Sequence, residues 1–199
     1  MSADLMCHCG ACGFDLTLST PKLSLLCGCE DCLQALQWGA LKGGAKPMLL
    51  PELIYVQSDI LAVTGQQYMK AFQLREGGKS TRVYCTLCFS LLGVEHPSYR
   101  NNVFMFFKQH CRVNFDISQT PAAAIYLNEL PDISKLEVPL SVPIFYSFRF
   151  QQELMRFREI VTHTFKEPEF KSLGQSLQNF IKTLGPIEVL HLEKGQKLV

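Results

Sequence analysis

The sequence predicts a mainly β fold with a helical C-terminal extension, and three observations support that class. Up to about residue 115 the chain is a series of short apolar runs separated by Gly and Pro turns, as in a compact all-β core. Eight of the nine cysteines lie in three tight clusters. Towards the C-terminus, apolar residues recur with helical spacing, at Phe150, Leu154, Phe157 and Val161. We therefore expect a β domain over residues 1–138 and a helical extension over residues 139–199 that packs on it.

Alternation of apolar and polar residues predicts most of the strands. From Phe14 to Leu18, for example, apolar residues alternate with polar ones, and successive strand side chains point to opposite faces. Strands are expected at residues 14–18, 23–26, 65–74, 81–84, 91–94, 103–107, 112–115 and 187–192, with two more between 49 and 64. Helical structure is expected as a turn or two at 33–38, around 150–161, and from a Ser172 cap to Leu184.

Composition excludes several classes of function. The chain is 47% hydrophobic and 19% charged, with a formal net charge of +1, so nothing favours a nucleic-acid or anionic-membrane partner. No apolar run approaches the ~18 residues of a membrane span, and the first residues lack the pattern of a signal peptide. The odd number of cysteines favours metal binding or redox chemistry over paired disulfides, and we expect a cytoplasmic protein.

The cysteine spacing predicts metal sites. The pattern C-x-C-x-x-C occurs at residues 7–12 and again at residues 27–32, and a C-x-x-C pair follows at residues 85–88. Thiolates bind zinc in a tetrahedron, and short cysteine hairpins from distant parts of a chain usually supply them. Eight thiols can complete two four-sulfur sites, or one closed site and one open site with a cysteine left over. We expect two zinc ions per chain.

The three clusters, in this order and spacing, resemble the glutathione-dependent formaldehyde-activating enzyme family, which includes centromere protein V. The resemblance covers roughly residues 5–95, and more weakly the strands to about residue 135. It implies a zinc-pinned β-sandwich with two kinds of zinc site. The resemblance assigns a closed structural site to Cys7, Cys9, Cys85 and Cys88. It assigns a second zinc, with an open fourth position, to Cys27, Cys29 and Cys32.

The chain departs from the family pattern in four places. Cys12 stands where the family usually has an apolar residue, and Phe89 replaces the glycine that commonly follows the last motif cysteine. Glu30 and Asp31 make the central loop unusually acidic, and the short family members lack a helical tail. These departures bear on the substrate more than on the fold.

The resemblance implies a carbon–sulfur lyase similar to S-(hydroxymethyl)glutathione synthase. Its expected partners are a small thiol such as glutathione and a small carbonyl compound. Three thiolates make zinc a weak Lewis acid towards water, but a soft substrate thiolate suits the open position. Cys27, Cys29 and Cys32 are therefore the expected catalytic centre, and Glu30 is a candidate proton shuttle beside it.

Two other interpretations stay open. In the first, the protein is a non-catalytic scaffold: both zinc sites are structural, Cys12 or Cys111 closes the central one, and the tail binds a partner. In the second, the protein is a methionine sulfoxide reductase, for which Cys111 is the available reactive thiol outside the clusters. The sequence also leaves open whether the chain forms a homodimer.

Overall fold

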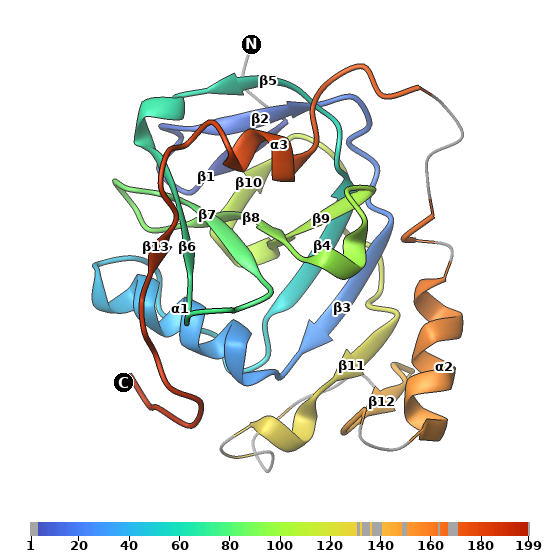
Figure 1. The fold of residues 1–199 in the computed structure, drawn as a ribbon. Coiled ribbons are helices and arrows are strands. Elements are labelled where there is room, and N and C mark those ends of the chain that lie inside the picture. Colours follow the sequence, from blue (N-terminus) through green and yellow to red (C-terminus); the bar gives the residue numbers. More distant parts are fainter. Residues whose placement is uncertain are drawn as a thin grey trace.

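The computed structural model describes residues 4–130, 132, 136, 141–148, 151–162, 164–166 and 171–198. Within them the chain is mainly β, as predicted, and its strands form two sheets (Figure 1). The smaller has the order β10-β1-β2-β5, and the larger has the order β12-β11-β3-β4-β9-β8-β7-β6-β13. The strands are β1 (Leu5–Cys7), β2 (Gly13–Leu16), β3 (Leu23–Cys27), β4 (Glu52–Gln57), β5 (Ile60–Thr64), β6 (Met69–Gln73), β7 (Thr81–Cys85), β8 (Leu91–Glu95), β9 (Val103–Phe107), β10 (Cys111–Val113), β11 (Ala123–Ile125), β12 (Ile144–Phe145) and β13 (Glu188–Val189).

Most of these strands are predicted by the sequence. Each strand expected between residues 14 and 115 has a counterpart, and β13 confirms the last one. The strand expected at 65–74 begins only at Met69, after a 3-10 turn at Gln66–Tyr68. The strands β1, β11 and β12 are not predicted. β11 pairs in parallel with both β3 and β12, so no local hairpin signals either short strand.

β4 shows how the larger sheet is buried on both faces. Leu53 and Tyr55 enter one apolar core together with α1 (Glu30–Leu41), whereas Ile54 and Val56 enter the other. The second core lies between the two sheets. The cysteine clusters lie where strands of these cores end. Cys27 ends β3 in the first core, and Cys7 and Cys85 end β1 and β7 in the second.

α1 is longer than the turn or two that the sequence predicts. It spans Glu30–Leu41 and begins inside the second cysteine cluster, because the Cys29 sulfur accepts a hydrogen bond from the Cys32 backbone N–H as an N-cap. Two acidic residues in its first turn suit the positive end of the helix. The Trp38 ring lies 4.3 Å from the Phe72 ring, measured between centroids, and packs the helix against the larger sheet.

The C-terminal extension packs on the core at several places (Figure 1). α2 (Gln151–Val161) contributes Phe157 and Val161 to the core on the α1 side, as their predicted spacing implies. Phe150 and the predicted boundary after residue 138 lie outside the described residues. β12 and β13 extend the larger sheet by parallel pairing with β11 and β6.

The second predicted helix is wrong in its start and its length. α3 spans only Leu177–Ile181 and is capped by Ser176, whose hydroxyl oxygen accepts a backbone N–H at 3.2 Å. Ser172 instead donates its hydroxyl hydrogen to Asp59 Oδ1, 2.8 Å away. The Asp59 carboxylate also accepts the next two backbone N–H groups, so this segment is held against the start of β5 and does not begin a helix.

The described helices are short. α1 has 12 residues and α2 has 11. In the part of the chain that the structure describes, no helix has the length and apolar content needed to cross a bilayer.

Candidate metal centres and the adjoining cavity

Four cysteines that are distant in the sequence meet in one cluster. The sulfur atoms of Cys7, Cys9, Cys85 and Cys88 all lie within 4.8 Å of one another. The Cys7 and Cys9 sulfurs are 3.5 Å apart, and the Cys9 and Cys85 sulfurs are 3.9 Å apart. Four sulfurs at the zinc–sulfur distance in a tetrahedron are about 3.8 Å apart. The cluster therefore fits a closed four-thiolate metal site.

Tight turns bring these sulfurs together. After β1 the chain turns at Gly10, with φ +80°, and the Cys12 backbone N–H donates to the Cys7 sulfur at 3.4 Å. After β7 the chain turns at Phe89, whose N–H donates to the Cys85 carbonyl oxygen. Phe89 has φ +54°, in the left-handed region that favours glycine. This backbone geometry explains why a glycine is expected after the last motif cysteine.

The two cysteines that belong to neither cluster lie beside the four-cysteine cluster. Cys12 is fully buried next to Cys7, and Cys111 of β10 is the cross-strand partner of Cys7. The Cys111 thiol donates to the Leu91 carbonyl oxygen at 3.3 Å. The hypothesis that Cys12 or Cys111 closes the central cluster is therefore wrong, because both side chains lie at the other cluster.

The central cluster forms where β3 runs into α1. The sulfurs of Cys27, Cys29 and Cys32 lie within 4.8 Å of one another, and no fourth Cys, His, Asp or Glu among the described residues joins them. Cys27 and Cys32 are buried, whereas Cys29 is half-buried. As the N-cap of α1, Cys29 holds its sulfur at the positive end of the helix. Three sulfurs fit a metal ion with one open position.

A cavity of about 360 Å³ opens directly onto the central cluster. Its aromatic side chains are Tyr55, Tyr99, Tyr126, Phe148, Phe157 and Phe165. Its polar and charged side chains, besides the cysteines, are Glu30, Asp31, Ser80, Arg82, His96, Ser98, Glu129 and Lys194. A mostly apolar wall with a few polar groups is typical of a site for a small organic ligand.

Arg82 places a positive charge in the cavity wall. Its side chain is 2% exposed, and its guanidinium donates to the backbone oxygens of Ser80 at 3.2 Å and Asp31 at 3.3 Å. Its Nε has no partner among the described residues. Hydrogen bonds from the other two cluster thiols lower the pKa of Cys32 well below its ordinary value, and the charge of Arg82 contributes to this shift. Arg82 therefore offsets the negative charge of a three-thiolate centre.

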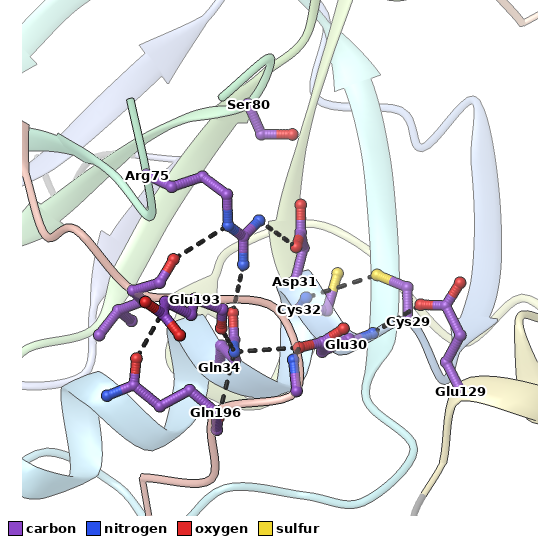
Figure 2. Close-up of polar contacts among 12 residues, drawn as sticks. Cys29, Glu30, Asp31, Cys32, Gln34, Arg75, Ser80, Glu129, Glu193 and Gln196 are labelled. Atoms are coloured by element: carbon purple, nitrogen blue, oxygen red, sulfur yellow. Dashed lines mark hydrogen bonds and ion pairs between the residues drawn. The ribbon is translucent and has the colours of Figure 1, made fainter. Parts of the chain in front are cut away.

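The acid that the sequence singles out, Glu30, binds the C-terminal part of the chain. Its Oε1 accepts hydrogen bonds from Gln34 Nε2 at 3.1 Å and from the Gly195 backbone N–H (Figure 2). Glu129, in the turn after β11, accepts the Glu30 backbone N–H at 3.0 Å and lies near Cys29. Burial raises the pKa of Glu129, and the charge of Cys29 adds to that increase. Sequence reasoning missed Glu129, because β11 is not predicted and no motif marks the turn after it.

A turn near the C-terminus is bound to α1 (Figure 2). The buried Gln34 amide donates to the carbonyl oxygens of Glu193 at 2.8 Å and Gln196 at 3.1 Å. Arg75 connects the same region to α1. Its Nε donates to the Leu192 carbonyl oxygen at 3.1 Å, and its guanidinium forms an ion pair of 2.6 Å with Asp31 of α1. These contacts hold Lys194 at the cavity, which it helps to line. The C-terminal turn is therefore part of the site.

Comparison with known protein families gives no match to the chain, and comparison with curated protein sequences gives none either. The family resemblance of the cysteine motifs therefore stays a prediction. The two clusters, which can hold metal ions, and the cavity are the observations that bear on function.

Proposed function

We propose that the protein is a zinc-dependent enzyme that joins a small thiol to a carbonyl compound and cleaves the same carbon–sulfur bond in the reverse direction. The observation that carries this proposal is the cavity, which opens onto the three-cysteine cluster. A structural zinc site is closed by four protein ligands. Three thiolates beside a cavity suit a metal ion that accepts a ligand from outside the protein.

The proposal extends to the metal and to the fold family. We assign the four-cysteine cluster to a structural zinc, and we assign Cys27, Cys29 and Cys32 to a second zinc. When bound there, zinc supplies a positive centre that favours the thiolate form of a substrate thiol such as glutathione. The two packed sheets are compatible with the β-sandwich of formaldehyde-activating enzymes, and this support is independent of the motif spacing.

The side chains of the cavity suit addition of a thiolate to a carbonyl group. The sulfur forms a bond to the carbonyl carbon, the π electron pair moves to the oxygen, and the oxygen takes a proton. A hemithioacetal forms without an oxidant or a reductant. We assign the proton transfer from thiol to oxygen to Glu129, the acid near Cys29.

Two tyrosines are the donors that we assign to the developing oxyanion. The hydroxyl oxygens of Tyr55 and Tyr99 lie 3.4 Å apart, and both residues line the cavity. Burial raises the pKa of both hydroxyls, so both keep their protons at neutral pH and can donate.

Zinc stoichiometry, together with thiol binding, tests the proposal. The native chain should hold two zinc ions, and Cys29→Ala should hold one and stay folded, because the four-cysteine site is intact. In cobalt-substituted protein, glutathione should change the visible spectrum of the native chain but not that of Cys29→Ala. Cys111→Ala is the matched control, and it should keep both metals and the response to glutathione.

A non-catalytic scaffold with two structural zinc ions is the competing function. It requires a fourth protein ligand at the central cluster, and the described residues supply none within 4.8 Å of the three sulfurs. If glutathione leaves the native spectrum unchanged and loss of Cys29 unfolds the chain, the scaffold replaces the enzyme. A methionine sulfoxide reductase is less favoured, because Cys111 lies beside the four-cysteine cluster and does not line the cavity.

A further inference from the structure

The rings around the cavity form two groups, and the C-terminal extension contributes to both. The first group is Tyr126, Phe148 and Phe157, and the second is Tyr55, Tyr99 and Phe165. In the first group, Phe148 lies 4.6 Å from each of its two neighbours between ring centroids. In the second group, the three centroid distances run from 5.4 to 5.7 Å. The three phenylalanines all belong to the C-terminal extension, residues 139–199.

The cavity is much larger than a formaldehyde molecule requires. A water molecule occupies about 30 Å³ of the liquid, so a carbonyl compound of two heavy atoms needs about 60 Å³. The cavity measures about 360 Å³, and three of its six phenylalanine and tyrosine rings come from α2 and the residues on either side of it. The thiol body takes up part of this volume, but formaldehyde alone does not need these rings.

The three phenylalanines of the cavity come from different elements than three of its charged side chains. Glu30 and Asp31 lie in the first turn of α1, and Lys194 lies in the C-terminal turn that is bound to that helix. Figure 1 shows this turn beside the start of α1, while α2 lies across β3 and β11 from it. An adduct with its sulfur at the central cluster can therefore direct a polar thiol body towards the C-terminal turn. The substituent of its carbonyl carbon then faces the rings.

We propose that the carbonyl substrate carries an apolar, ring-sized substituent, and that Phe148, Phe157 and Phe165 form the subsite that receives it. This inference rests on the proposed function, because it names the substrate class of the same cluster. The reaction is the same as in the proposed function. The carbon–sulfur bond forms, the π electron pair of the carbonyl group moves to the oxygen, and the thiol proton ends on that oxygen. The substituent takes no part in bond making and contributes through burial and ring contacts.

Two unreactive thioethers test the subsite without turnover. S-benzylglutathione and S-methylglutathione differ by one phenyl ring, and calorimetric titration gives the affinity of the zinc-loaded protein for each. The native chain should bind the benzyl compound at least about tenfold more tightly, because the ring is buried against other rings. Phe157→Ala should lose most of this preference and bind the methyl compound as the native chain does. Met155→Ala, on the same helix and 54% exposed, should keep the preference.

Each outcome decides the inference. Equal binding of the two thioethers by the native chain overturns it, and a response of the cobalt spectrum to glutathione would then leave the proposed function intact. A preference that survives in both Phe157→Ala and Phe165→Ala also overturns it. If the native chain binds neither thioether and does not bind glutathione either, the proposed function is overturned as well. Circular dichroism checks the fold of each variant, and Phe157→Leu, which keeps apolar bulk but no ring, replaces Phe157→Ala if that variant does not fold.

Discussion

The backbone N–H of Glu30 donates a 3.0 Å hydrogen bond to Oε2 of Glu129, so two acids from distant parts of the chain meet at the start of α1. Their carboxylates have different partners. That of Glu30 accepts hydrogen bonds from Gln34 and from the C-terminal turn, whereas that of Glu129 lies near Cys29 (Figure 2). The two acids should therefore respond differently to substitution.

Glu129→Gln should lower the rate of adduct formation about 100-fold, because an amide cannot carry the proton from thiol to oxygen. Zinc content should stay at two ions per chain, since Glu129 is outside both metal clusters. Glu30→Gln is the matched variant and should change the rate little, because the amide oxygen can still accept the hydrogen bonds that hold the C-terminal turn. Initial rates with glutathione and an aldehyde provide the measurement. Equal losses in the two variants would argue against Glu129 as the proton carrier.

Cys12→Ala should keep both zinc ions, because Cys12 is packed beside the four-cysteine cluster without belonging to it. The smaller side chain should cost on the order of 1 kcal/mol of unfolding free energy through the cavity that it leaves. Cys85→Ala should release one zinc and lower the melting temperature strongly, because a structural zinc contributes to folding. Metal analysis and thermal melts of both variants test this contrast. Loss of a zinc ion from Cys12→Ala would make Cys12 a ligand after all.

Local patterns predict most of the strands, although not β1, β11 and β12. The alternation around Phe14 predicts β2, and the aromatic run at residues 103–107 predicts β9, because both signals lie within a few residues. The resemblance assigns to the two sites the same cysteines that the structure groups, whereas the spacing alone leaves the grouping open. The membership of the two cysteine clusters was therefore the most predictable part of the site.

The rest of the site depends on contacts between distant segments. β11 has the sequence Ala-Ala-Ile and forms through parallel pairing with β3 and β12, so neither it nor Glu129 after it has a local signal. The length of α1 follows from a cysteine N-cap, a role that its metal motif does not indicate. Phe165 reaches the cavity by packing on Tyr55 and Tyr99, and no periodicity predicts that contact.

Gln34→Leu should loosen the C-terminal turn. The substitution removes the donor to the carbonyl oxygens of Glu193 and Gln196, and each such hydrogen bond contributes about 1 kcal/mol net. Amide hydrogen exchange of Gly195 should become faster, because its bond to Glu30 depends on the same turn. Gln37→Leu, on the same helix and without a side-chain hydrogen bond to this turn, is the control. Unchanged exchange in Gln34→Leu would mean that other contacts hold the turn.

Glu95 should make stability fall with rising pH. It ends β8, is 7% exposed, and has one carboxylate oxygen without a partner among the described residues. Burial raises its pKa from 4.5 to about 7, so the folded chain binds the proton more tightly than the unfolded chain does. Well below pH 4.5 the carboxyl is protonated in both the folded and the unfolded state, and it does not change the free energy of unfolding with pH. Between those pH values the unfolded state ionises first, and above about pH 7 the folded state carries the full cost of a buried charge.

Glu95→Gln should therefore raise the free energy of unfolding at pH 8 by on the order of 2 kcal/mol, and by clearly less at pH 5.5. Urea denaturation of the zinc-loaded native and variant chains at both pH values measures the difference. Comparing the two chains at one pH cancels the common effect of acid on the thiolate sites. Glu76→Gln, in the exposed turn before β7, is the matched control. A Glu95→Gln gain that is equal at the two pH values would mean that the carboxyl is not held protonated by burial.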